Sequence, residues 1–230
     1  MMKRCMRRFA ICFLVVVYLM IGCTAGNPEG EPIGEMEIDY FMTIAFGAEY
    51  GDSEARVRKW TEDLRIKVSG TPTSEDEETL DKVIEELNVL QRQVTLKLVD
   101  EKPNVEMIFA PEAGFAKLEP NYEPTNYGFF WVNWNSMGEI YRARILISSD
   151  RITQQERSHL VREELTQSLG LMRDSIRYPD SIFYANRTDA AEYSDLDRAV
   201  IKILYRDEIE PNMTQSEVRE VLNSLKSSVQ

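Results

Sequence analysis

The hydrophobic pattern of this chain changes from strand-like to helix-like near residue 150. Before that point, apolar and polar residues alternate in four segments, as expected for strands with one buried face: residues 64–68, 94–98, 105–109 and 143–148. The aromatic segment 127–134 is also typical of a strand. After it, apolar residues recur at helical spacing, and Thr153, Ser194 and Thr214 each precede an acid three residues later, the pattern of a capping box. A strand-rich half followed by a helical half predicts a single α+β domain, with a twisted mixed sheet packed on helices.

One further helix is expected inside the strand-rich half. Ser74 and Glu77 form a capping box, and an apolar stripe with helical spacing follows: Leu80, Val83, Ile84, Leu87 and Leu90. Residues 111–126 contain three prolines and are expected to form a long loop, a kind of segment that is often functional.

The N-terminal residues have the pattern of an export signal. Residues 3–8 carry four basic residues and no acid, and the apolar run at 9–22 is shorter than the roughly 20 residues that a membrane-spanning helix needs. The run ends in Leu-Met-Ile-Gly before Cys23, which resembles a bacterial lipobox. We expect residues 1–22 to be a lipoprotein signal peptide and Cys23 to carry a lipid that holds the protein at a membrane of the cell envelope, in the periplasm or at the cell surface. A plain cleaved signal and an uncleaved anchor remain open alternatives.

Residues 23–39 are expected to form a flexible tether between this anchor and the domain. They contain five acids with Gly and Pro, and they show no apolar periodicity. The domain is then expected to span residues 40–230, with a C-terminal helix at 214–228. Cys5 and Cys12 lie inside the signal, so the mature chain would hold no cysteine pair.

Composition excludes two classes of function. The chain has 27 Lys and Arg against 39 Asp and Glu, a formal net charge of −12, which argues against a nucleic acid as partner. A single histidine, His159, excludes any zinc site that is built on two or three imidazoles.

A row of polar residues is expected along the helix that begins after Thr153. His159, Glu163 and Gln167 are four residues apart and share one line on the helix, and Glu164 lies beside that line. Such a row can be a solvent-exposed face or the wall of a cleft, and the spacing alone favours the solvent-exposed face.

The segment from Glu163 to Leu171 resembles the active-site helix of the metzincin metallopeptidases, especially the matrixins. Their pattern is H-E-x-x-H-x-x-G-x-x-H. In this register Glu163, Gln167 and Arg173 occupy the three zinc-ligand positions, with Asp174 directly after the third. Glu164 matches the general-base glutamate, and the glycine of the pattern is also present.

Two further segments extend this resemblance. Residues 180–184 look like the family's Ser-Ile-Met-Tyr turn, with Phe183 in place of Met, and residues 143–148 lie where its substrate-pairing edge strand would be. The resemblance implies a zincin fold. The combination of Glu-Glu-Leu-Thr-Gln-x-Leu-Gly-Leu with Ser-Ile-Phe is similar still more closely to an uncharacterised bacterial family, domain of unknown function number 2927. That resemblance implies a zincin-like fold outside the cytoplasm and no established activity.

The residues at the ligand positions do not suit zinc. Zinc hydrolases prefer mainly nitrogen or sulfur ligands, whereas these positions hold a carboxylate, an amide and the guanidinium of Arg173, which cannot bind a cation. We therefore expect no metal or cofactor. A structural alternative is that Arg173 forms an ion pair with Glu163, and that Gln167 donates to Glu163 or Glu164. Another alternative is a harder divalent metal at His159 and Glu163, aided by Glu164 or Asp174.

Two classes of function follow from these alternatives. The favoured one is a catalytically degenerate peptidase relative that acts as a binding or scaffold module, with a peptide or partner protein in its cleft. The other is a peptidase or other hydrolase that has an atypical metal site and uses Glu164 as general base.

Overall fold

The computed structural model describes residues 33–46, 56–124, 126–186, 188 and 190–227. All of these belong to one compact unit that spans Pro32–Gln230. The expected signal peptide and the expected lipidation site at Cys23 lie outside the described residues.

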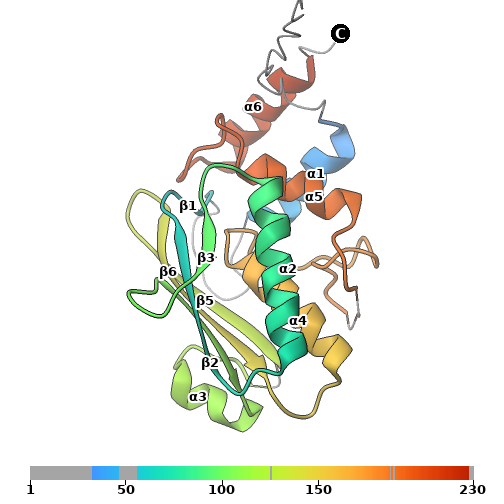
Figure 1. Ribbon diagram of the computed structural model, residues 1–230. Coiled ribbons are helices and arrows are strands. Elements are labelled where there is room, and N and C mark those ends of the chain that lie inside the picture. The colour runs from blue at the N-terminus through green and yellow to red at the C-terminus, as the bar shows by residue number, and fades with distance from the viewer. Residues whose placement is uncertain (1–32, 47–55, 125, 187, 189, 228–230) are drawn as a thin grey trace, which may run out of the picture. The chain divides into compact units, whose positions relative to one another are not determined.

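A six-stranded, mostly parallel sheet organises the domain (Figure 1). Its strands run in the spatial order β1-β6-β4-β2-β3 and are parallel to one another, while β5 pairs antiparallel with β6. Their bounds are β1 Lys59–Trp60, β2 Leu64–Gly70, β3 Leu96–Leu98, β4 Val105–Ala110, β5 Gly128–Trp134 and β6 Glu139–Ser148. Each of the strand segments expected from alternation contains one of these strands, and the expected α+β class is confirmed.

The long strand β6 lies inside the sheet. Residues from Ala143 to Ser148 pair with β4, and residues from Ile140 to Ile147 pair with β5. The expectation that residues 143–148 form an edge strand is therefore wrong. The antiparallel strand β5 covers that side of β6, and β5 is itself the strand at the edge.

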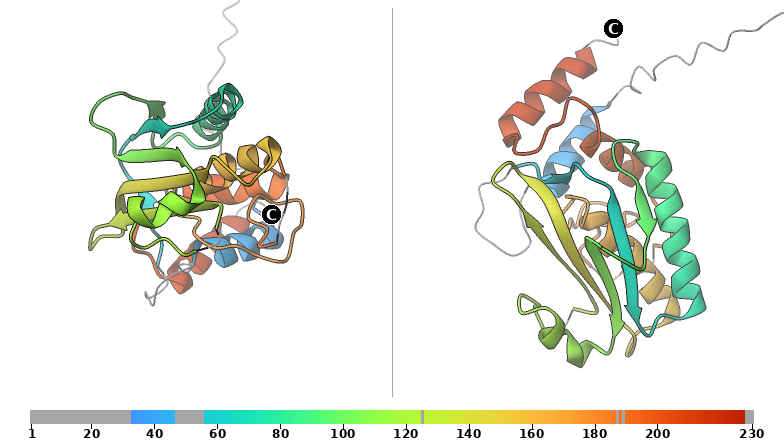
Figure 2. Two further views of the ribbon diagram at one scale, coloured as in Figure 1. Left: turned by 90° about the horizontal axis from the view of Figure 1, so that it is seen from below. Right: turned by 60° about the vertical axis from the view of Figure 1, so that its left-hand side comes forward.

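The helices divide between two faces of this sheet (Figures 1 and 2). On one face α2 and α4 lie side by side, and α1, α5 and α6 pack together near one end of the unit, whereas the short α3 lies on the other face. The bounds are α1 Glu35–Ala45, α2 Ser74–Leu90, α3 Phe115–Leu118 after a 3₁₀ turn at Glu112–Gly114, α4 Gln154–Gln167, α5 Asp195–Leu204 and α6 Gln215–Ser227.

Side chains of β6 pack into two separate hydrophobic cores, one on each face of the sheet. Ala143, Ile145 and Ile147 pack into the large core beneath the helices, while Leu146 points to the other face and packs with Phe115 of α3. Because successive side chains of a strand point to opposite faces, this one strand holds both layers to the sheet.

The domain begins earlier than its composition predicts. Helix α1 starts at Glu35, and Ile38 on it is fully buried in the main core. The expected flexible tether therefore does not extend to residue 39. The acids that made this segment look like a tether include Glu35 and Glu37, which lie in the first helical turn, where the helix dipole favours negative charge.

Three of the four expected capping boxes are confirmed, and one is displaced by a residue. Thr153, Ser194 and Thr214 cap α4, α5 and α6 through the acids three residues later. Helix α2 is capped by Thr73 and Asp76 instead of Ser74 and Glu77. The reason lies outside the helix, because the fully buried Asp76 also accepts hydrogen bonds from two residues of α4.

Helix α4 ends at Gln167, and Gly170 ends the turn that follows it. Its φ of +125° is one that side chains rarely tolerate, and a Cβ atom there would lie 1.9 Å from the carbonyl oxygen of Arg58. The glycine thus lets the chain reverse directly against the backbone before β1.

A buried polar network anchors the segment that follows. The Tyr40 hydroxyl lies 2.7 Å from Oγ of Ser181, which donates to Oδ1 of Asp197 at 2.5 Å. The other oxygen of Asp197 accepts from the backbone N–H of Ile182 and Ser194. Burial raises the pKa of the Asp197 carboxyl, and these hydrogen bonds partly oppose that rise. The Ser-Ile-Phe turn is therefore tied to α1 through Tyr40 and to the first turn of α5 through Asp197.

Candidate functional site

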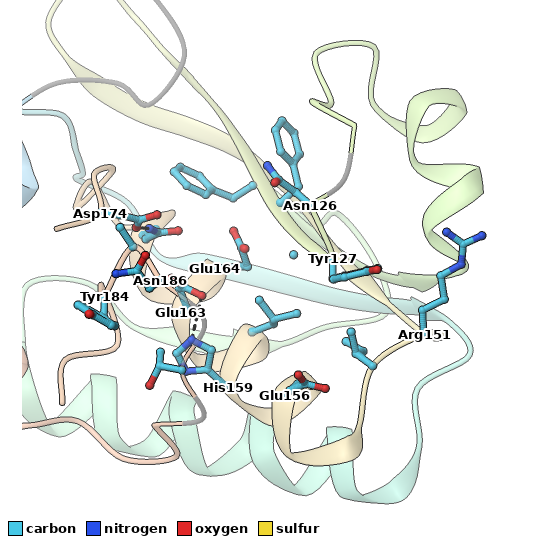
Figure 3. Close-up of a pocket in the computed structure, with 18 residues that line it drawn as sticks. Asn126, Tyr127, Arg151, Glu156, His159, Glu163, Glu164, Asp174, Tyr184 and Asn186 are labelled. Carbon is cyan, nitrogen blue, oxygen red and sulfur yellow. Dashed lines mark hydrogen bonds and ion pairs between the residues drawn. The ribbon is translucent and has the colours of Figure 1, made fainter. Parts of the chain in front are cut away.

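A cleft of about 460 Å³ opens beside α4. One wall is α4 itself, and the opposite wall is the start of β5 with the preceding Asn126 and Tyr127 (Figure 3). One end is closed by Asp174, Tyr184, Ala185, Asn186 and Thr188. The cleft therefore brings together segments that are distant in the sequence.

The polar row of α4 faces this cleft. His159, Glu163, Glu164 and Gln167 all line it, and the exposed fractions of His159, Glu164 and Gln167 are only 5%, 6% and 3%. The sequence-based preference for a solvent-exposed face is thus wrong. Val161 and Leu165 occupy the core side of the helix. Other segments cover the side that periodicity alone assigned to solvent.

His159 links α4 to the segment that closes the end of the cleft. Its Nδ1 lies 2.9 Å from the carbonyl oxygen of Ala190, and its Nε2 lies 3.1 Å from Oε2 of Glu163. Both ring nitrogens are thus engaged with oxygen atoms. A metal ion could reach His159 only by displacing one of these two contacts.

Glu164 reaches its place because Gly128 has no side chain. A Cβ atom at Gly128 would lie 2.3 Å from Oε1 of Glu164 and 2.7 Å from a methyl carbon of Leu160. Gly128 is a site residue that the sequence patterns above do not identify. The available signal was a glycine inside an aromatic strand pattern, which commonly marks close approach of another group.

Arg173 and Asp174 are adjacent in the sequence and point to opposite sides. Asp174 enters the cleft, where its Oδ1 accepts a hydrogen bond of 2.6 Å from Nε2 of Gln167. Arg173 is exposed, and it donates to the backbone oxygens of Ile44 and Phe46 near the end of α1. The expected Arg173–Glu163 ion pair and the expected bond from Gln167 to Glu163 or Glu164 are therefore wrong, because the third ligand position of the resemblance lies outside the cleft.

The donor set of the cleft does not fit a zinc ion. Glu163 contacts His159, the Gln167 amide nitrogen is a donor, and Arg173 contributes nothing to the cleft. Across the described part of the chain, no three His, Cys, Asp or Glu side chains are grouped so that they could hold a metal ion. The arrangement offers hydrogen-bonding and charged groups to a ligand, and it does not offer the nitrogen-rich site that zinc prefers.

Strand β5 presents an open backbone edge to the same cleft. The N–H of Ser148 donates to the carbonyl oxygen of Tyr127 at 2.7 Å, which fixes the residues of β5 whose backbone groups face β6. Since these groups alternate in an antiparallel pair, those of Gly128 and Phe130 point away from β6. Among the described residues β5 has β6 as its only strand partner, and both Gly128 and Phe130 line the cleft.

The fold and the site together define a mixed α+β domain with a mostly parallel sheet and a polar cleft. The family model described as proteins of unknown function, DUF2927, matches residues 35–224. The chain belongs to this family. The match begins at the first residue of α1, in agreement with a domain that includes this helix.

Two solved structures of myroilysin resemble the chain weakly. One has a TM-score of 0.44 with 12% identity and covers 76% of this chain and 97% of its own. The other has a TM-score of 0.40 with 14% identity and covers 65% of this chain and 82% of its own. No curated protein matches the sequence. Among the described helices, none combines the length and the hydrophobicity needed to cross a membrane.

Proposed function

We propose that this protein is a non-catalytic, zincin-like binding domain that holds an extended peptide segment in the cleft beside α4. The observation that carries the proposal is the open edge of β5, where the backbone groups of Gly128 and Phe130 face the cleft. A peptide that pairs with this edge would add a strand to the sheet, and its side chains would reach the polar row of α4.

The residues of the cleft favour binding over hydrolysis. Glu164 stands where a general base would be needed, but its neighbours do not supply a nitrogen-rich site for a zinc ion that would acidify a water. One observation supports a hydrolase as the alternative function: the carboxylates of Glu163 and Glu164 both line the cleft beside His159.

Binding can be tested with a pool of short randomised peptides. We expect affinity selection with mass spectrometry to recover intact peptides, and hydrogen exchange to show new protection of the Gly128 and Phe130 amides. Gly128→Val should abolish this binding, because its side chain would collide with Glu164 and Leu160. The matched control is Gly114→Val, since a Cβ atom at Gly114 has nothing within 4 Å.

Two outcomes would contradict the proposal. Recovery of no peptide by the folded wild-type protein would remove the binding function. Cleavage of the peptides in the presence of added manganese, calcium or zinc, with loss of cleavage in Glu164→Gln, would establish the hydrolase function in its place.

We also propose that the domain is exported and anchored through a lipid on Cys23. The support is the basic lead, the apolar run and the lipobox-like residues before this cysteine. In a bacterial host labelled with a radioactive fatty acid, Cys23→Ala should lose the label and leave the membrane fraction. The control Cys12→Ala, inside the expected signal, should keep both, and a labelled Cys23→Ala protein would refute the anchor.

A further inference from the structure

We propose that the cleft selects a basic residue, so that a bound peptide places the ammonium of Lys or the guanidinium of Arg against the carboxylates of α4. This inference rests on the proposed peptide-binding function and names its ligand class. Three properties of the cleft carry it: the balance of charge along its walls, the direction in which a paired peptide would point its side chains, and the burial of the carboxylates that would meet them.

The charge balance along the cleft is strongly negative. Glu156, Glu163, Glu164 and Asp174 contribute carboxylates to the lining. The guanidinium of Arg151 lies at the opposite end from Asp174, where it pairs with Glu112 at 3.4 Å and is 60% exposed (Figure 3). Since Arg151 is distant from the Asp174 end, a cationic group that enters there would meet acids from two segments of the chain.

The pairing geometry of β5 aims a peptide side chain at these acids. Residues that lie directly opposite one another in neighbouring strands project to the same face of the sheet. Phe130 and Val132 pack into the core on the helix-covered face, so Gly128, two residues before Phe130, belongs to that face as well. The peptide residue opposite Gly128 would therefore point toward α4, where Glu164 lies directly against Gly128 and occupies the space that a side chain there would fill.

Burial makes the carboxylates selective for charge. Glu164 is 6% exposed, and the side chain of Glu163 is 12% exposed. Attraction between opposite charges is stronger in such a partly desolvated site than in water, so a cation gains more from these acids than a neutral side chain of the same shape. The ring of Tyr127, which is 39% exposed at the mouth of the cleft, offers a surface on which the aliphatic stem or guanidinium could lie.

The test compares peptides that differ only in charge at one position. The probes are fluorescent short peptides of alternating Thr and Ala with Arg, its neutral isostere citrulline, or Glu at the centre. Fluorescence anisotropy in EDTA-containing buffer should give a dissociation constant at least about tenfold lower for the Arg peptide than for the citrulline peptide, and the weakest binding for the Glu peptide. Raising the sodium chloride concentration should weaken the binding of the Arg peptide more than that of the citrulline peptide.

Matched variants locate the charge that is responsible. Glu164→Gln and, separately, Asp174→Asn should reduce the preference for Arg over citrulline while citrulline binding stays unchanged. Glu85→Gln, the same chemical change at an exposed position of α2, should leave the preference intact. Thermal unfolding of each variant confirms that it is folded.

The outcomes separate this inference from the function on which it rests. Equal affinity for Arg and citrulline peptides, both protecting the Gly128 amide, would overturn the charge selection and leave peptide binding established. An Arg preference that is measured only when EDTA is left out of the buffer would also overturn it, because a metal ion would then mediate recognition. No binding of any of the peptides, together with none from the randomised pool, would overturn both proposals.

Discussion

Replacing Asp76 by Ala should lower the free energy of unfolding by about 3–5 kcal/mol, the usual result of breaking a buried ion pair from one side. The Asp76 carboxylate is completely buried and accepts from the Thr73 N–H at 2.8 Å, from Nε2 of Gln154 at 2.6 Å and from the Arg157 guanidinium at 3.2 Å. Its loss would leave the guanidinium of Arg157, 8% exposed, without its carboxylate partner and would remove one of the two hydrogen bonds of the capping box of α2, the one from the Thr73 N–H. Urea denaturation at neutral pH measures the effect.

The adjacent acid provides the control for this prediction. Glu77 is exposed in the same first helical turn, so Glu77→Ala should change the free energy of unfolding by less than about 0.5 kcal/mol. If the two variants were destabilised equally, the effect would come from helix-dipole charge in general, and the buried link between α2 and α4 would not be important for stability.

Stability should rise with pH between about 8 and 10, and Lys59 should be a main cause. This side chain is 3% exposed, and its Nζ donates to the carbonyl oxygens of Leu204 and Ile209 beside the ring of Tyr205. Burial lowers the pKa of the Lys59 ammonium from 10.5 to about 8. Above pH 8 the folded protein therefore releases this proton, while the unfolded chain retains it. This difference stabilises the folded state by up to about 3 kcal/mol as the pH approaches 10.5, the pKa of the lysine in the unfolded chain.

Tyrosines limit this gain at higher pH. Burial raises the pKa of Tyr40, Tyr193 and Tyr205 above 10, so the unfolded chain loses these protons first, and stability falls as the pH rises beyond that value. The contribution of Lys59 is isolated by comparing denaturation curves over this pH range. Lys59→Met should flatten the rise, whereas Lys67→Met, at an exposed position of β2, should not. A rise that persists in Lys59→Met would contradict the assignment.

Local patterns predict the elements of this fold well and their surroundings poorly. Alternation predicts the strands because each has one face in a core, and caps predict helix starts because the bonds involved lie within four residues. The displaced cap of α2 shows the limit of such patterns. Asp76 is selected over Glu77 by Arg157 and Gln154, whose contacts with it depend on the tertiary packing of two helices.

The candidate site also combines residues that a local sequence pattern identifies with residues from distant segments that it does not identify. The row from His159 to Gln167 is local and was identified, but Asn126, Gly128 and Asn186, which turn it into a cleft wall, come from other segments. Arg173 and Asp174 are neighbours in sequence and face opposite ways, and the turn at Gly170 that orients them is not encoded by helical periodicity.

The internal position of β6 constrains how the sheet can assemble. Among the described residues, β1 and β5 each pair with β6 alone, and β6 begins at Glu139. A nascent or truncated chain that stops before this residue could form β2, β3 and β4, but it would expose the flank of β4 that β6 later covers. Pairing between segments so distant along the chain is slow, and an uncovered strand edge invites association with other chains. We expect the completed chain to fold slowly and fragments that end before β6 to aggregate.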